Sequence, residues 1–141
     1  MFKSLFDEIA KKNDFCKSFG GWYLKNNNNI VVLELQKSSY SNSYYLNVKI
    51  FIQGLFGKTY SIEKALIKSS SGIFTKQIRD IDILNLELDI SQEKRDIELN
   101  NLFVQTISPF VAKCLSLEGI KELIKEDALV LLPAVKKELG W

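Results

Sequence analysis

The first part of the chain shows apolar residues at the spacing of an amphipathic helix. Phe2, Phe6 and Ile9 fall three or four positions apart, and lysines occupy positions between and after them. Asn13, a residue type that favours helix ends, follows directly. The pattern therefore predicts a helix over residues 2–12 that packs one apolar face against the rest of the protein.

The next part of the chain alternates between short apolar strands and polar turns. The alternation is clearest over residues 84–90, where leucine or isoleucine occupies every second position, with Asn85, Glu87 and Asp89 between them. This period of two predicts a half-buried strand with an acidic outer face. Residues 60–71 fit either a short helix or a loop. The other predicted strands cover residues 22–24, 30–35, 44–52 and 73–78, and the four asparagines at 26–29 predict a tight turn between the first two.

The last third of the chain carries helical patterns. Ser91 and Ser116 are good N-caps, and each precedes apolar residues at helical spacing. Asp127 is a third candidate cap. Two of the predicted helices contain a proline, Pro109 or Pro133, at which the helix either bends or starts again.

These elements define the predicted fold class. We expect an α+β protein in which an antiparallel sheet of about five strands is flanked by an N-terminal helix and C-terminal helices. No repeat, linker or change of composition divides the chain, so we expect one domain over residues 1–141.

Charge and composition narrow the classes of function. The chain has 19 basic and 17 acidic residues, and the resulting net charge of +2 lacks the basic footprint of a nucleic-acid binder. No apolar run is long enough to span a membrane, and the first helix, which contains acidic residues, is unlike a signal peptide. We therefore expect a cytoplasmic protein that binds neither nucleic acid nor membrane. In that reducing compartment we expect Cys16 and Cys114 to be buried thiols.

Catalytic motifs are scarce in the sequence. The chain contains no histidine, which excludes Ser-His and Cys-His catalysis, and its glycines form no phosphate-binding loop. We therefore expect no cofactor.

Carboxylates are the remaining catalytic option. A metal-dependent hydrolase or nuclease could use Asp80 and Asp82, which would share a strand face, or Glu34 followed by Lys37 at a strand end. The alternative for the paired carboxylates is a solvated strand face.

Aromatic residues gather around the first two predicted hairpins. Trp22, Tyr40 and Tyr44 all fall there. Such side chains anchor protein interfaces because they combine a large apolar area with a polar group, and they are also good strand formers. The sequence leaves both roles open.

Two segments resemble a known bacterial family. The apolar strand that ends in Gln36-Lys37-Ser38 and the aromatic strand that starts with Tyr44-Tyr45 resemble the domain of unknown function 4304. The family brings no established activity, cofactor or catalytic residue. What the resemblance implies is a small bacterial domain of a kind that is sometimes suspected to act as an immunity protein for a partner toxin. The polar side chains of the turn at residues 36–38 would then offer hydrogen bonds to a partner.

Two main functional hypotheses follow, with binding of a small ligand in a cavity between the sheet and the helices as a third possibility. The first is a non-enzymatic protein-interaction module, with an immunity protein that neutralises a bacterial toxin as its specific form. The second is the metal-dependent hydrolase or nuclease. For the first hypothesis, the predicted binding residues are Trp22, Gln36, Lys37, Ser38, Tyr40 and Tyr44.

Overall fold

The computed structural model describes residues 1–79 and 81–141. It begins with the predicted amphipathic helix, α1 (Phe2–Lys12), and this prediction is confirmed. The side chains of Phe6 and Ile9 are buried, as their spacing in the sequence indicated.

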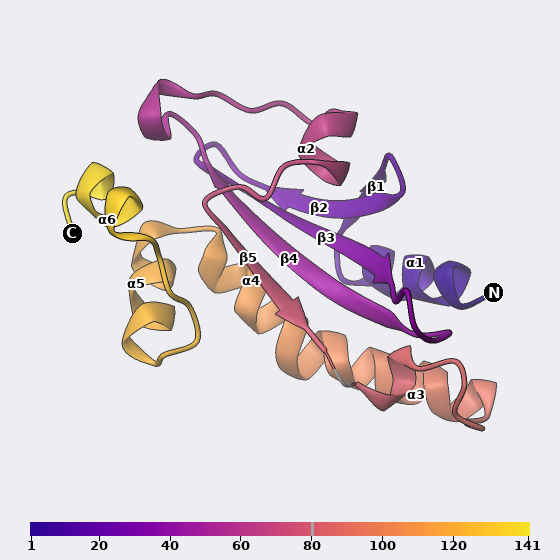
Figure 1. The fold of residues 1–141 in the computed structure, drawn as a ribbon. Helices are drawn as coiled ribbons and strands as arrows, with labels where there is room; N and C mark the ends of the chain where they lie inside the picture. The colour runs from indigo at the N-terminus through magenta and orange to yellow at the C-terminus, as the bar shows by residue number, and fades with distance from the viewer. Residues whose placement is uncertain (80) are drawn as a thin grey trace.

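Five strands form one antiparallel sheet, and their order in space is their order in the chain (Figure 1). β3 and β4 pair along their whole length and make the centre of the sheet. The predicted α+β class, with about five antiparallel strands and flanking helices, is confirmed. The strands are β1 (Cys16–Ser18), β2 (Gly21–Lys25), β3 (Asn29–Lys37), β4 (Tyr44–Ile52) and β5 (Phe74–Ile78).

The predicted strand over residues 84–90 is wrong. The chain there forms a 3-10 helix, η2 (Asp82–Leu84), followed by turns. The guanidinium of Arg95, in the following helix, donates to carbonyl oxygens of this segment and so holds it in its turned conformation, and an isolated bridge joins its Asn85 to Ser43. The bonds run to the carbonyls of Ile83, Asn85 and Leu88, at 2.6, 3.2 and 3.0 Å. The remaining strand of the sheet is β1, which the sequence pattern did not predict.

The turn between β2 and β3 is built by side chains. The Oδ1 atom of Asn26 accepts hydrogen bonds from the backbone N–H groups of Asn28 and Asn29. The amide groups of Asn26 and Asn29 donate to the carbonyls of Leu115 and Cys114, at 2.7 and 2.8 Å. The asparagine run therefore both turns the chain and binds the end of a distant helix.

Helices form most of the remaining chain. The predicted caps at Ser91 and Ser116 are confirmed, because each Oγ atom accepts a hydrogen bond from the backbone three residues later. Asp127 caps no helix. It has a left-handed φ of 58°, and the last helix starts at Pro133. The helices are α2 (Lys64–Lys68), α3 (Gln92–Leu102), α4 (Ser108–Cys114), α5 (Leu117–Lys125) and α6 (Pro133–Leu139), with a further 3-10 helix, η1 (Leu55–Gly57).

A π-helical turn, η3 (Phe103–Ile107), joins α3 to α4, so helical backbone continues through this region. Pro109 lies in the first turn of α4. Proline has no N–H, and in a regular α-helix its ring would meet the carbonyl four residues earlier, here that of Gln105. Gln105 lies within the wider π turn, which accounts for a proline in a continuous helix.

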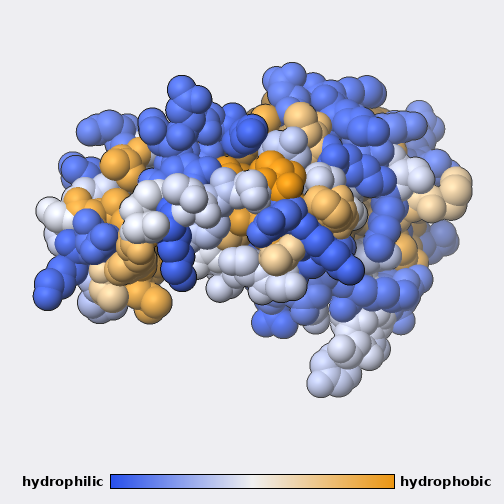
Figure 2. All heavy atoms as spheres, turned by 90° about the horizontal axis from the view of Figure 1, so that it is seen from above, coloured by the Kyte–Doolittle hydropathy of each residue, from blue (hydrophilic) through white to orange (hydrophobic). Residues whose placement is uncertain are grey.

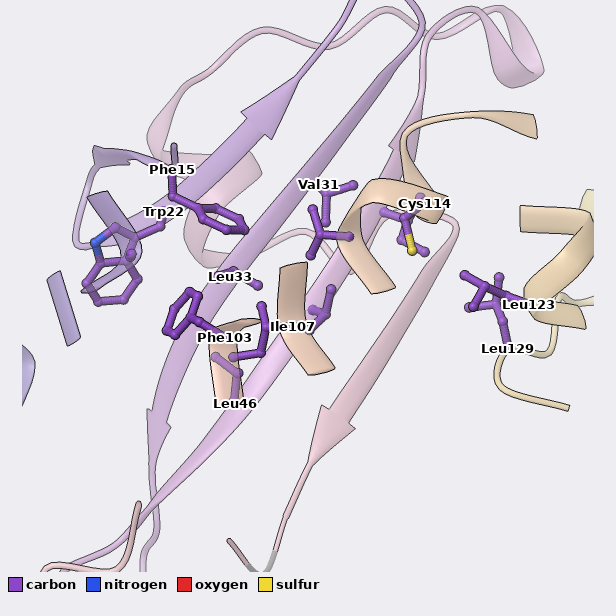
Figure 3. Close-up of a cluster of buried hydrophobic side chains, with 14 of the residues drawn as sticks. Phe15, Trp22, Val31, Leu33, Leu46, Phe103, Ile107, Cys114, Leu123 and Leu129 are labelled. Carbon is purple, nitrogen blue, oxygen red and sulfur yellow. The ribbon is translucent and has the colours of Figure 1, made fainter. Parts of the chain in front are cut away.

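The main core lies between one face of the sheet, which we call the inner face, and helices α1, α3 and α4 (Figure 3). Aromatic rings pack together where α1 meets β2: the ring of Phe6 lies 4.6 Å from that of Trp22 and 5.2 Å from that of Phe103. These distances are typical of favourable aromatic pairs.

The opposite face of the sheet, the outer face, is covered over one end only. There α2 buries Leu66 and Ile67 against Ile30, Val32 and Phe51. Figure 2 shows the molecule from above, the side on which α2 lies in Figure 1, and its surface atoms are mostly hydrophilic, with apolar atoms in small separate groups. This view therefore shows no large apolar patch.

The two cysteines differ in their surroundings. Cys114 is buried in the main core, as predicted, and burial raises the pKa of its thiol to about 12. Cys16 lies on the edge strand β1 and is exposed, so the prediction of two buried thiols is wrong for Cys16. A three-residue edge strand has too little pattern to show which side chains it buries.

Candidate functional site

The uncovered part of the outer face carries a row of polar side chains. Strand register puts Glu34 of β3 opposite Asn47 of β4, and Asn47 opposite Gln77 of β5. Side chains two positions apart on a strand share a face, so Gln36 and Lys49 join the same group. We call these five residues, Glu34, Gln36, Asn47, Lys49 and Gln77, the polar ladder.

The amide side chains of the polar ladder are hydrogen-bonded to one another across three strands. The Oε1 atom of Gln36 accepts from Asn47 at 2.9 Å and from Gln77 at 3.2 Å. Gln77 also donates to Oδ1 of Asn47 at 2.9 Å. Each amide therefore restricts the rotation of its neighbours, and the row is held in place before anything binds to it.

A buried ion pair ends the ladder on the side of α2. The ammonium of Lys49 lies 3.0 Å from Oε1 of Glu34 and donates to the carbonyl of Ile67, also at 3.0 Å. The Lys49 residue is 5% exposed. Because the two opposite charges lie together, this end of the ladder adds no net charge to the outer face.

Arginine and tyrosine side chains border the other end of the ladder. The guanidinium of Arg79 lies 4.7 Å from the centre of the Tyr45 ring, within the range of a cation–π contact. The hydroxyl of Tyr45 donates to Ser38 at 3.5 Å and so connects the ladder to the loop between β3 and β4. Tyr40, in the same loop, is 96% exposed.

The structure separates the residues that the sequence put together as a binding site. Gln36 belongs to the polar ladder, and Tyr40 lies in the adjoining loop. Ser38 is buried and accepts a hydrogen bond from the backbone of Tyr40 at 3.1 Å. Its role is thus to hold the loop.

The other three predicted binding residues lie elsewhere. Lys37 and Tyr44 pair in the sheet with their side chains on the inner side, where Tyr44 stacks on Phe2 at 5.5 Å between ring centres. Trp22 is 2% exposed and lies in the main core (Figure 3). A buried indole offers no surface to a partner, so we leave Trp22 out of the site.

Those carboxylates of the hydrolase hypothesis that the structure describes, Glu34 and Asp82, lie in different elements. Glu34 and Lys37 are three positions apart in β3 and therefore point to opposite faces of the sheet. Asp82 is exposed in η2, and Asp80 lies outside the described residues. Within residues 1–79 and 81–141, no group of three or more histidine, cysteine, aspartate or glutamate side chains is placed to hold a metal ion.

Sequence reasoning missed three members of the ladder. The alternation over residues 44–52 already put Asn47 and Lys49 on the face opposite the apolar residues, and this was the signal that could have found them. Gln77 becomes a neighbour only through the pairing of β4 with β5, which the sequence does not give.

The fold and the site together define a class: a five-stranded antiparallel meander with helices over its inner face and a partly open, polar outer face. In the part of the chain that the structure describes, no helix has the length and apolarity needed to cross a membrane.

The chain belongs to the family described as "Domain of unknown function (DUF4304)", whose sequence model matches residues 6–112. This match confirms the family resemblance read from the strands. It covers most of α1, the whole sheet and most of α4, so the polar ladder lies within the family region, whereas α5 and α6 lie beyond it. No curated protein and no solved structure was found to match the chain.

Proposed function

We propose that this protein is a non-enzymatic protein-interaction module that binds a partner protein through the polar ladder and its border. The observation that carries the proposal is the pair of exposed amides on the outer face, Gln36 and Gln77, which hydrogen bonds to each other and to the buried Asn47 hold in place. A surface that is ordered before binding loses less conformational entropy when it binds.

The ladder has hydrogen-bonding groups left for a partner. Within the described residues, the Nε2 group of Gln36 and the Oε1 atom of Gln77 have no hydrogen-bond partner, and both side chains are exposed. One side chain therefore offers donors and the other an acceptor. A backbone segment or an amide side chain of a partner has the complementary pair of groups.

The border supplies residues of the types that dominate binding energy at interfaces. Tyrosine and arginine are enriched among such residues, and Tyr40 and Arg79 are both exposed beside the ladder. Because Lys49 and Glu34 neutralise each other, the interface would depend on hydrogen bonds and aromatic contacts more than on charge.

The specific form that we propose is an immunity protein that binds and neutralises a bacterial toxin in the cytoplasm. The support is the family resemblance of the strand that ends in Gln36-Lys37-Ser38, together with the exposure of Gln36 and Tyr40 at that end of the sheet. A net charge of +2 favours a toxin that is not strongly basic, since inhibitors usually carry charge complementary to their target.

Site-directed photo-crosslinking tests the interaction surface. A photoreactive amino acid replaces Gln77 on the ladder or, as the matched control, Gln105, an exposed glutamine on η3. In cells of the source organism we expect a discrete adduct from position 77 and none from position 105. Adducts of equal yield from both positions, or none from position 77, would contradict the proposal.

A growth assay tests the immunity function separately. The protein is co-expressed with the product of the gene directly upstream of its own, provided that this product alone stops growth. We expect wild type and Gln105→Arg to restore growth and Gln77→Arg to fail while remaining folded. If neither wild type nor the control restores growth, the immunity function is wrong, although a crosslinked partner would still support an interaction module.

A further inference from the structure

A pocket of about 200 Å³ lies at the end of the molecule where α1 and α3 begin. It is separate from the polar ladder and shares no residue with it. Its walls are mostly apolar, and two polar residues complete its lining. The lining side chains that matter here are Phe2, Leu5, Leu86, Ile90, Gln92 and Arg95.

Arg95 is the unusual member of this lining because it is only 8% exposed. Both hydrogens of its Nη1 group are used, by the carbonyls of Ile83 and Asn85, and Nη2 donates once, to Leu88. The Nε–H and one N–H of Nη2 are left without an acceptor among the described residues.

Among the residues that the structure describes, the charge of Arg95 has no anionic partner. The ion pairs of residues 1–79 and 81–141 include other cations but not this guanidinium. Carbonyl oxygens satisfy part of its hydrogen bonding but carry no negative charge. A buried cation without a counter-ion is unfavourable, so the site favours a ligand that brings an anion.

The backbone adds to the positive potential at this place. Gln92 is the first residue of α3, and Phe2 is the first residue of α1, so two helices present their N-terminal ends to the pocket. Helix N-termini favour anions. The two helix N-termini and the guanidinium of Arg95 therefore both favour a negatively charged ligand in this pocket.

We propose that this pocket binds a small carboxylate with an apolar body, such as an aryl or short-chain alkyl acid. The carboxylate pairs with the free N–H groups of Arg95, and the apolar body lies against Phe2, Leu5 and Leu86. The volume sets the size, because an apolar cavity of about 150 Å³ is large enough for benzene. The pocket therefore fits one ring or a chain of similar volume.

Calorimetry with acids and their neutral amides tests the proposal. Phenylacetate and hexanoate are the probes, and phenylacetamide and hexanamide are their matched neutral partners. We expect the acids to bind with a Kd of about 1 mM or tighter and the amides to bind at least about tenfold more weakly. Equal binding of acid and amide would overturn the role of Arg95.

A pocket-filling variant shows where the acids bind without disturbing Arg95. Leu5→Trp fills the pocket from the face of α1 and leaves the backbone acceptors of Arg95 unchanged. Leu139→Trp, at a partly buried leucine of α6, is the control. We expect Leu5→Trp to lose acid binding by at least about tenfold and Leu139→Trp to keep it.

Arg95→Gln is the direct test of the charge, and circular dichroism shows whether that variant folds. If it unfolds, the Leu5→Trp comparison still decides the location of the site. No acid binding to wild type at 10-fold the expected Kd, about 10 mM, or unchanged binding to Leu5→Trp, would refute the pocket as a carboxylate site.

Discussion

The indole Nε1–H of Trp22 donates a hydrogen bond to Oδ1 of Asp7 at 2.9 Å and so joins β2 to α1. The bond gives the indole N–H of Trp22, whose ring is buried in the core, an acceptor in the carboxylate of Asp7. Asp7 also forms an ion pair with Lys11 at 3.0 Å. The hydrogen bond from Trp22, with a smaller effect of Lys11, holds the pKa of Asp7 below its usual value of 3.8.

The lowered pKa of Asp7 predicts a pH-dependent part of the stability. At pH values above the pKa that Asp7 has in the unfolded chain, its carboxylate contributes its full stabilisation of the folded state. This contribution is lost as the pH falls through the lower pKa that Asp7 has in the folded protein. Asp7→Asn should therefore lower the free energy of unfolding by about 1 kcal/mol at pH 7. The variant and wild type should converge as the pH falls below 3.8. Urea unfolding followed by circular dichroism measures both values.

The control for this prediction is Glu8→Gln, a similar change at an exposed position of the same helix. It should alter neither the stability at pH 7 nor the acid dependence. If Asp7→Asn and wild type differed by the same amount at every pH, the hydrogen bond from Trp22 would not depend on the charge of Asp7.

The buried pair of Glu34 and Lys49 predicts a strong asymmetry between single and double substitutions. Glu34→Gln removes the negative charge beside the buried Lys49 ammonium and leaves it only uncharged amide and carbonyl acceptors, and we expect a loss of about 2–4 kcal/mol in the free energy of unfolding. Glu34→Leu combined with Lys49→Met removes both charges and should recover most of that loss. Chemical denaturation at pH 7 gives the three values.

Glu98→Gln is the matched control for this pair. Glu98 lies 3.9 Å from Lys94 on the exposed side of α3, where water screens the interaction. This substitution should leave the stability unchanged. A loss for Glu34→Gln as small as that for Glu98→Gln would mean that the pair beside the polar ladder is effectively solvated.

The different burial of the two cysteines predicts two rates of thiol modification. Cys16 is exposed and should react readily with an aromatic disulfide reagent in the folded protein at pH 8. Cys114 is buried and its pKa is raised to about 12, so the nucleophilic thiolate is scarce and inaccessible. It should react only after denaturant is added. One fast equivalent in wild type and none in Cys16→Ser is the expected result, whereas two fast equivalents would contradict the described core.

The fold was predictable from the sequence where local pattern and tertiary packing agree. The helix over residues 2–12 and the strand over residues 44–52 have the predicted bounds, because each buries one apolar face against the main core. The family resemblance rested on the same central strands. Local pattern was therefore sufficient for the class of fold.

Long-range contacts explain what the sequence did not predict. The alternation over residues 84–90 is as regular as that of a strand, yet Arg95 binds the carbonyls of this segment from the next helix. The polar ladder similarly depends on the register of β4 with β5. Neither the hydrogen bonds of Arg95 nor the pairing of β4 with β5 can be derived from the spacing of apolar and polar residues along the chain.

The candidate site was predicted only in part, because exposure could not be derived from residue type. Gln36 and Tyr40 are exposed at the ladder and its loop, whereas Trp22 fills the core. Tryptophan is found both in interfaces and in cores, so its presence near a hairpin did not distinguish the two. The hydrogen bond to Asp7 shows which role it has here.

The most direct test of the central claim is the affinity of the crosslinked partner for two variants, measured by isothermal titration calorimetry. Gln77→Arg puts a bulky charge on the polar ladder, and Gln105→Arg makes the same change on η3. We expect Gln77→Arg to weaken binding by at least about tenfold and Gln105→Arg to change the Kd by less than about twofold. Equal Kd values for the two variants, or a larger loss for Gln105→Arg, would show that the partner does not bind the polar ladder.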